Sequence, residues 1–118
     1  MKAVSEFKGI FLHRDPVDMR KGVNGLSEIV EQAEMGDLMG PHLFVFCSRR
    51  RDVLKILYFD RSGFALWYKR LEQEKFPWPR KLEESVVSLS PEQLQWLLSG
   101  LDIWKMKPFS DLRYEKFS

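Results

Sequence analysis

The chain has 118 residues, of which 44% are hydrophobic, so it fits one compact domain, and no apolar run approaches the ~20 residues that a membrane helix needs. Its single cysteine, Cys47, excludes an internal disulfide, and together with His13 and His42 it does not form a spaced set of zinc ligands. The formal net charge is only +2, but residues 49–81 carry ten Lys and Arg against four Asp and Glu, and this local positive block can attract phosphate groups.

The N-terminal part of the chain predicts a short strand followed by an amphipathic helix. We expect the strand over residues 7–12, although Gly9 weakens it, and a turn at residues 15–16. Asp18 is placed to cap the helix, because its carboxylate can accept hydrogen bonds from the free amides of the first turn. The helix then presents one apolar stripe, formed by Leu26, Ile29, Val30 and Ala33.

The middle of the chain predicts three consecutive strands. Residues 43–47 form a continuous apolar run, which is typical of a central strand, and residues 53–59 and 64–70 are rich in β-forming side chains. A polar loop at residues 48–52 joins the first two strands, and a tight turn with Gly63 at positive φ joins the next two. Such short connections predict an antiparallel meander.

The C-terminal third predicts an edge segment, a short strand and a helix. Residues 75–81 contain two prolines, which cannot join a central ladder, so we expect them at the edge of the sheet. Residues 85–89 read as a short strand. Ser90 begins the clearest helix, since Pro91 occupies the first helical position and Gln93 can complete a capping box.

Together these elements predict an α+β fold, with an antiparallel sheet built around the three-stranded meander and two helices packed on one face. We expect a single domain over residues 1–104 and a polar tail over residues 105–118. No secretory signal is visible, because Glu6 and Lys8 interrupt the apolar N-terminal residues, and a cytoplasmic location is therefore expected.

Three stretches of the chain carry a resemblance to a known family. They are residues 17–22 with 25–26, residues 43–46 with Arg50 and Arg51, and residues 55–60, 63–64 and 66–72 with Phe76, Trp78 and Pro79. The most specific of them is Leu-Trp-Tyr-Lys-Arg-Leu-Glu at residues 66–72, preceded by Lys-Ile-Leu-Tyr at residues 55–58. Over roughly residues 8–104 the chain resembles the TnpB accessory proteins, which the second reading frame of bacterial insertion sequence 66 elements encodes. The resemblance implies a role in DNA transposition beside a separate, larger transposase, and it implies no chemical activity.

The residues themselves offer no convincing catalytic set. Metal-dependent phosphoryl transfer needs two or three converging carboxylates. The candidates have simpler roles: Asp18 as a helix cap, Asp60 as a turn residue and Glu72 as a solvated charge. Cys47 lies within an apolar run, which favours a buried structural thiol, and residues 22–25 lack the Lys-Ser/Thr ending of a nucleotide-binding loop. We therefore expect neither enzyme activity nor a metal or cofactor.

The basic block is the stronger candidate for function. Alternation along the second and third strands lets either face of the sheet present aromatic rings beside cations, an arrangement that suits bases and phosphates. The alternative is that the rings belong to the core and the cationic side chains reach solvent at their tips. The side chains expected to contact the DNA of the element ends are Arg49, Arg50, Arg51, Lys55, Trp67, Lys69 and Arg70.

Two groups of cations within the chain keep alternative interpretations open. Three successive arginines at a loop tip, residues 49–51, fit phosphate contact and solubility equally well. Arg20 and Lys21 would oppose the dipole of the first helix, which indicates either phosphate binding shared with the helix amides or, slightly favoured, a structural pair with a carboxylate.

A rival hypothesis assigns the chain to a different class of protein. It would be an interaction module that docks the transposase and never contacts DNA. The exposed aromatic side chains Phe76 and Trp78 would then form the anchor, since Trp and Arg are typical hot-spot residues of protein interfaces.

Overall fold

The computed structural model describes residues 4–105, which form five strands and two α-helices. In chain order the elements are a 3-10 helix (Val4–Glu6), β1 (Gly9–His13), α1 (Val23–Gln32), β2 (His42–Cys47), β3 (Val53–Asp60), β4 (Gly63–Arg70), β5 (Val86–Ser88) and α2 (Pro91–Leu98). Each strand and helix expected from the sequence is present, with bounds shifted by a few residues. Neither helix in the described part of the chain is long and apolar enough to cross a membrane. The tail expected from residue 105 lies, apart from Lys105, outside the described residues.

The five strands form one sheet in the order β4-β3-β2-β1-β5. β2, β3 and β4 pair antiparallel, in registers that place Phe44 opposite Leu57 and Val53 opposite Arg70. β1 pairs parallel with β2, because the chain crosses over through α1 between them, and β5 pairs antiparallel with β1. The α+β class and a mostly antiparallel sheet around β2, β3 and β4 are therefore confirmed, but the sheet is not wholly antiparallel, because β1 pairs parallel with β2.

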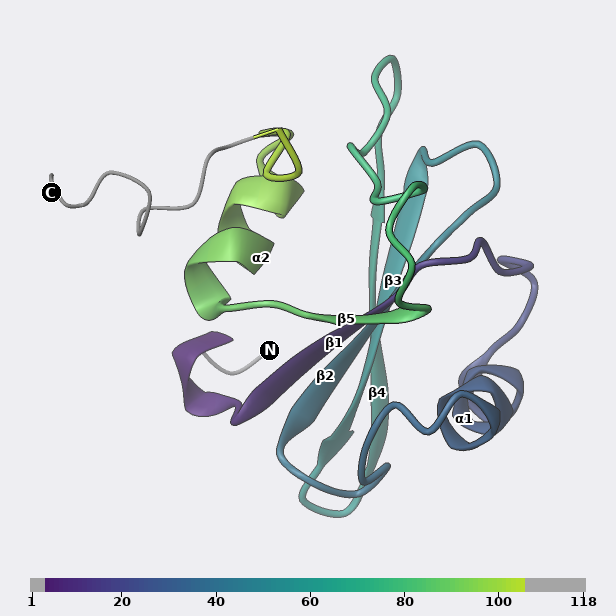
Figure 1. Ribbon diagram of the computed structural model, residues 1–118. Coiled ribbons are helices and arrows are strands. Elements are labelled where there is room, and N and C mark those ends of the chain that lie inside the picture. The colour runs from purple at the N-terminus through teal and green to yellow at the C-terminus, as the bar shows by residue number, and fades with distance from the viewer. Residues whose placement is uncertain (1–3, 106–118) are drawn as a thin grey trace, which may run out of the picture.

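The two helices cover opposite faces of the sheet, which Figure 1 shows nearly edge-on between them. The core on the α1 side consists of Leu26, Val30, Met35, Phe44, Phe46 and Leu57. The core on the α2 side includes Leu43, Val45, Leu54, Ile56, Leu94 and Leu97. The expectation that both helices pack on one face is wrong. Every side chain of β2 from Leu43 to Cys47 is buried, so each face of this strand needs its own apolar cover.

The helix α2 begins as the sequence predicts. The hydroxyl of Ser90 accepts a hydrogen bond from the backbone N–H of Gln93 at 3.1 Å, and the side-chain oxygen of Gln93 accepts one from the backbone N–H of Ser90 at 2.8 Å. The capping box is therefore confirmed, with Pro91 at the first helical position.

The helix α1 begins differently from the prediction. Its N-cap is Gly22, which makes no side-chain capping bond, so the assignment of Asp18 as the cap is wrong. Asp18 instead closes a turn of its own: Oδ1 accepts a hydrogen bond from the backbone N–H of Arg20 at 2.9 Å, and the carbonyl oxygen accepts one from Lys21 at 3.0 Å. Asp side chains often bond an amide two residues ahead in this way, and this local bond has replaced the helix cap.

The connection from β4 to β5 closes one end of the sheet instead of extending its edge, so the expected edge segment at residues 75–81 is wrong. Phe76 is only 1% exposed and Trp78 only 7% exposed, and both belong to the core on the α2 side. The indole N–H of Trp78 donates to the carbonyl oxygen of Arg14 at 2.8 Å. The expectation that Phe76 and Trp78 are exposed anchors for a partner is therefore also wrong, because both rings are needed to close the core.

Two arginines adopt a left-handed backbone conformation at the two ends of β3. Arg51 precedes β3 with φ of 64°, and Arg61 follows it with φ of 53°. The expectation that Gly63 supplies the positive φ of the β3–β4 turn is wrong, since Arg61 does so and Gly63 begins β4.

Candidate nucleic-acid interface

The loop between β2 and β3, residues 48–52, is held in place by hydrogen bonds among its own residues and the start of β3. The hydroxyl of Ser48 donates to Asp52 Oδ1 at 3.0 Å and accepts from the backbone N–H of Val53 at 3.1 Å. The backbone N–H of Arg51 donates to the carbonyl oxygen of Ser48 at 2.9 Å. We call these five residues the arginine loop.

The β4–β5 connection braces the arginine loop from outside. The backbone N–H of Leu71 donates to the carbonyl oxygen of Asp52 at 2.8 Å, and that of Phe76 donates to the carbonyl oxygen of Arg51 at 2.7 Å. The ammonium of Lys75 donates to the carbonyl oxygen of Arg50 at 3.1 Å. Three successive backbone carbonyl oxygens, of residues 50–52, thus accept hydrogen bonds from the β4–β5 connection.

Arg49 and Arg50 are exposed at the tip of the arginine loop. The ion pairs formed within residues 4–105 use Arg14, Arg20, Arg70 and Lys105 as their cations, so none of them neutralises Arg49 or Arg50. Two adjacent guanidinium groups repel each other, and an external anion would relieve that repulsion.

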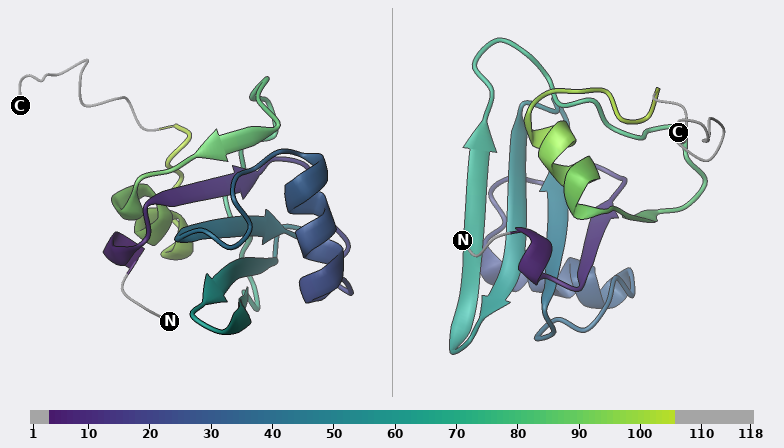
Figure 2. Two further views of the ribbon diagram at one scale, coloured as in Figure 1. Left: turned by 90° about the horizontal axis from the view of Figure 1, so that it is seen from below. Right: turned by 90° about the vertical axis from the view of Figure 1, so that its left-hand side faces the viewer.

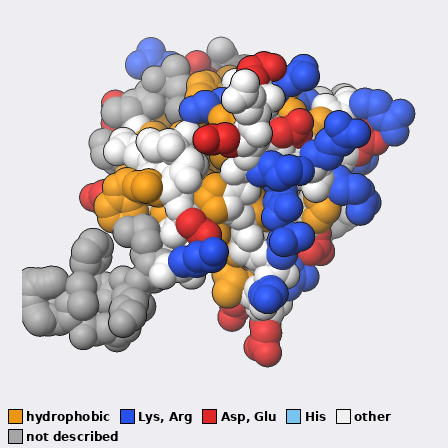
Figure 3. Space-filling model, turned by 90° about the horizontal axis from the view of Figure 1, so that it is seen from above, with side chains coloured by type: hydrophobic (Ala, Val, Ile, Leu, Met, Phe, Trp, Pro, Cys, Tyr) orange, Lys and Arg blue, Asp and Glu red, His pale blue; other side chains and the backbone are white. Residues whose placement is uncertain are grey.

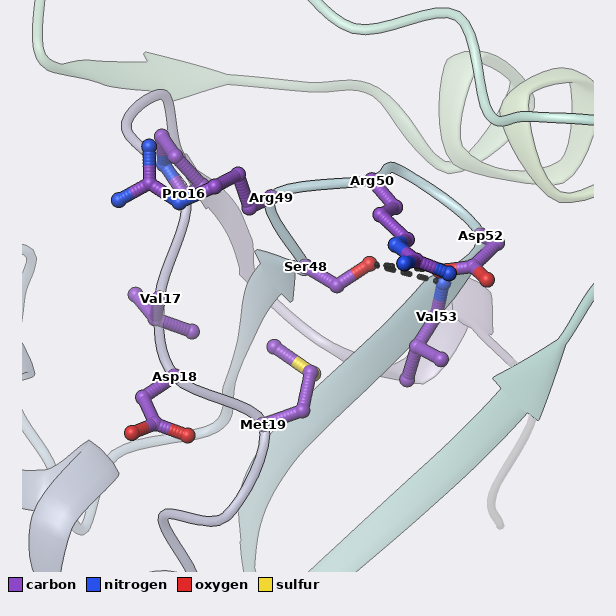
Figure 4. Close-up of a pocket in the computed structure, with 9 residues that line it drawn as sticks. All are labelled: Pro16, Val17, Asp18, Met19, Ser48, Arg49, Arg50, Asp52 and Val53. Atoms are coloured by element: carbon purple, nitrogen blue, oxygen red, sulfur yellow. Dashed lines mark hydrogen bonds between the residues drawn. The ribbon is translucent and has the colours of Figure 1, made fainter.

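A cavity of about 500 Å³ lies beside the arginine loop, and Figure 4 shows the side chains that line it. We call it the loop cavity. Its lining consists of Pro16, Val17, Asp18, Met19, Ser48, Arg49, Arg50, Asp52 and Val53. Four of these side chains are apolar, and they come from the β1–α1 connection and from the first residue of β3. Arg49 and Arg50 line the side formed by the arginine loop, so the cavity combines apolar and cationic surfaces.

The wall formed by the β1–α1 connection is also fixed by hydrogen bonds. The backbone N–H of Val17 donates to the carbonyl oxygen of Cys47 at 3.0 Å. The ammonium of Lys55 donates to the carbonyl oxygens of Met19 at 2.7 Å and Lys21 at 3.0 Å. Lys55 was expected to contact phosphate, but its charge is engaged within the protein and positions this wall.

Arg20 pairs with Asp18, which belongs to this wall of the loop cavity. The guanidinium donates from Nε and Nη2 to the carboxylate, with the shortest contact at 2.6 Å. The hydrogen bonds from Arg20 hold the pKa of Asp18 well below its usual range, and the same pairing raises the pKa of Arg20. The structural pair favoured for Arg20 is therefore present. Lys21 is exposed and takes no part in the ion pairs of the described residues.

Alternation along β4 divides the expected aromatic and cationic residues between the two faces of the sheet. Trp67 packs against the core on the α2 side. Lys69 points to the same side, where its ammonium donates to the carbonyl oxygen of Leu98 at 2.9 Å, near the end of α2. These two residues therefore do not join the surface around Arg49. Arg70 lies on the α1 side, opposite Val53 of the loop cavity, and is exposed.

The structure thus brings together part of the predicted set at one end of the molecule, which we call the basic end. Viewed toward this end, Lys and Arg side chains gather along one side (Figure 3). Arg49 and Arg50 line the loop cavity, and Arg20 pairs with Asp18 of its lining. Arg70 lies opposite Val53 of the lining, and Lys21 lines a second cavity that shares Pro16, Val17 and Asp18 with the first. Arg51 is separated from them, since it lines another cavity of about 480 Å³ together with Arg80, Lys81 and Lys105.

The sequence interpretation missed two side chains of this region. Lys75 contributes a cation next to Arg50, because its ammonium bonds the backbone there. Tyr68 is 53% exposed and lies opposite Lys55 in the β3–β4 register, on the face that carries Arg70. Strand alternation already separated Tyr68 from Trp67, but only the positions of the helices decide which of the two rings is exposed.

The residues considered for catalysis are dispersed in the structure. Asp18 is paired with Arg20, Asp60 lies in the β3–β4 turn, and Glu72 is exposed beside Arg70 at 4.0 Å. Within residues 4–105, no group of three or more His, Cys, Asp or Glu side chains could hold a metal ion. Burial raises the pKa of the Cys47 thiol to about 12, which keeps this buried group protonated at neutral pH.

Comparison with known proteins identifies the family. The family model described as IS66 Orf2 like protein matches residues 8–108. Two relatives from Sinorhizobium fredii, the uncharacterized proteins y4jC and y4hO, are each 38% identical to this chain, over 83% and 75% of both chains respectively. No solved structure matches. The chain therefore belongs to the IS66 Orf2-like family, the accessory proteins of insertion sequence transposition.

Proposed function

We propose that this protein binds the DNA of its insertion sequence through the basic end and acts there as a non-catalytic accessory factor beside the element's transposase. The observation that carries the proposal is the pair Arg49 and Arg50, exposed at the tip of a braced loop and without a carboxylate partner among the described residues. Binding to element DNA in a bacterium implies the cytoplasm as the place of action.

The surroundings of Arg49 and Arg50 favour phosphate as the bound group. Arg70 and Lys75 lie next to the arginine loop, on the neighbouring strand and on the bracing connection. A guanidinium presents paired N–H donors in a geometry that matches phosphate oxygens. Cations gathered at one end also produce a local positive field, although the whole chain is nearly neutral.

The test measures the affinity for labelled element-end DNA and for a scrambled sequence by fluorescence anisotropy across a salt series. The double variant Arg49→Glu/Arg50→Glu should weaken binding at least tenfold and reduce the slope of log affinity against log salt by about 1.4–1.8, since each of the two lost phosphate contacts contributes about 0.7–0.9 to that slope. The matched control is Lys8→Glu/Arg61→Glu, which changes the net charge equally but at the opposite end of the sheet. The control should bind DNA nearly as well as the unmodified protein.

Two outcomes would overturn the proposal. Affinity that does not fall as salt rises would exclude a phosphate-dominated interface. Absence of binding at low salt would favour the rival function, in which the protein docks the transposase without contacting DNA. Co-purification with the transposase after nuclease treatment would then establish that rival function directly.

A further inference from the structure

The loop cavity indicates which form of DNA the basic end accepts. Its volume of about 500 Å³ lies within the ~300–1,000 Å³ range of small-molecule sites, and it is open to solvent on one side. Val17, Met19 and Val53 supply apolar surface, whereas Arg49 and Arg50 line the side formed by the arginine loop (Figure 4). Two carboxylates also line the cavity, but Asp18 is paired with Arg20 and Asp52 accepts a hydrogen bond from Ser48. This combination matches a nucleotide, whose base prefers an apolar surface and whose phosphate prefers the arginines.

Hydrogen bonds within the protein fix both walls of the loop cavity. The wall at residues 16–19 is held by the bonds from Val17 to Cys47 and from Lys55 to Met19, and the arginine loop is held by Ser48. A preformed site avoids the entropy cost of ordering its walls when a ligand binds. The cavity is therefore suited to accept a group of fixed size.

A base in a DNA duplex cannot enter such a cavity. Stacked base pairs present only their edges in the grooves, so a whole base reaches a side pocket only after it leaves the stack. Unstacking and unpairing cost free energy in a duplex and much less in a single strand. We infer that the loop cavity takes one unstacked base, and that the protein consequently prefers single-stranded to duplex DNA; this inference rests on the proposed function.

Tyr68 extends the same surface beyond the cavity. Its ring is 53% exposed and lies opposite Lys55, whose ammonium bonds the backbone of Met19 in the cavity wall. Arg70, two residues further along β4, lies opposite Val53. An exposed ring beside a cation is the arrangement on which successive bases of a single strand stack.

The test compares one labelled 20-nucleotide strand with the duplex of the same sequence, both measured by anisotropy at the same salt concentration. We expect the single strand to bind about tenfold more tightly or better. Val53→Phe fills the cavity with a ring that suits a β-strand and should remove most of that preference. Tyr68→Ala should lower single-strand affinity several-fold, and its exposed position makes the fold insensitive to the change. The control Met39→Phe adds the same ring at an exposed site, 64% accessible, and should leave both affinities unchanged.

The outcomes separate this inference from the proposed function. Duplex affinity equal to or above single-strand affinity, or a preference that Val53→Phe leaves intact, would overturn the inference while DNA binding stands. If the protein binds neither probe, the proposed function itself is overturned. Thermal unfolding of each variant identifies any loss of affinity that comes from a failure to fold. If Val53→Phe does not fold, the single-strand affinity of Tyr68→Ala decides the result.

Discussion

The two hairpin loops at the ends of β3 contain an arginine with the same left-handed backbone, yet they are built differently. The arginine loop before β3 receives hydrogen bonds from Leu71, Lys75 and Phe76 of the distant β4–β5 connection. The β3–β4 turn, residues 60–63, exposes Asp60, Arg61 and Ser62, and its hydrogen bonds to other described residues stay within the turn and its flanking strands. Figure 2 shows the two loops at opposite ends of the β3 strand.

This difference shows that bracing is not needed to connect two strands. The β3–β4 turn reverses the chain with fewer residues and without help from elsewhere. Left-handed non-glycine residues cost about 1–3 kcal/mol and persist where the surroundings determine them. The additional bonds of the arginine loop therefore serve what the loop carries, namely Arg49, Arg50 and one wall of the loop cavity.

The largest expected effect comes from removing the buried ring that anchors the bracing connection in the core. Phe76→Ala should lower the free energy of unfolding by about 3–5 kcal/mol, because the ring is almost fully buried and leaves a cavity. Phe64→Ala, beside the β3–β4 turn, should cost less than half as much, since Phe64 is only partly buried and pairs edge-on with Phe59. Urea unfolding of both variants measures the two values, and equal losses would contradict the distinction between the loops.

A smaller effect is expected from the hydroxyl inside the arginine loop. Ser48→Ala should cost about 1–2 kcal/mol, because Asp52 and the backbone N–H of Val53 each lose a partner. Ser62→Ala in the β3–β4 turn should stay within about 0.5 kcal/mol, as is typical of exposed positions. Cys47 provides a second readout, since its buried thiol reacts with an alkylating reagent only when the end of β2 opens. Ser48→Ala should accelerate that labelling, whereas Ser62→Ala should not.

Local sequence patterns predicted the elements but not how they pack together. The capping box at Ser90 and the run at residues 43–47 are signals within a few residues, and the structure has both elements. The run at residues 43–47 also contained the evidence for two covered faces, because a strand without polar alternation is buried on both sides. The prediction of both helices on one face did not take this burial pattern into account.

Which residues belong to the candidate site depends on contacts between residues that are far apart in the sequence, and local sequence patterns do not reveal such contacts. Lys55 and Lys69 carry the same charge as Arg49, but each ammonium bonds a backbone carbonyl that is distant in the chain. Those carbonyls become neighbours only after the helices and connections have docked on the sheet. Phe76 and Trp78 show the same limitation, because two prolines in their segment indicated an exposed edge, whereas their rings close the core.

A still smaller effect is expected from the backbone strain that the two loops share. Arg51→Gly and Arg61→Gly should each raise the free energy of unfolding by about 0.5–1 kcal/mol, because glycine adopts positive φ without a steric penalty but loses more conformational entropy on folding. Thermal unfolding measures both changes. A gain at Arg61 without one at Arg51 would show that the bonds around the arginine loop depend on the Arg51 side chain, which lines the cavity of about 480 Å³.

The smallest effect concerns Asp18, the acid in the lining of the loop cavity that pairs with Arg20. Asp18→Asn removes one negative charge and frees Arg20, whose side chain is 92% exposed, so DNA affinity should rise about twofold at low salt. Asp60→Asn, in the β3–β4 turn, should leave the affinity unchanged. The Asp18 pKa is lowered by folding, so the pair stabilises the protein above the ordinary carboxyl value of 3.8 and this stabilisation is lost as pH falls through the lower folded value. The stability difference between the unmodified protein and Asp18→Asn should therefore be constant near neutral pH and shrink in strong acid, and a difference that grows on acidification would exclude the Arg20 pairing as its cause.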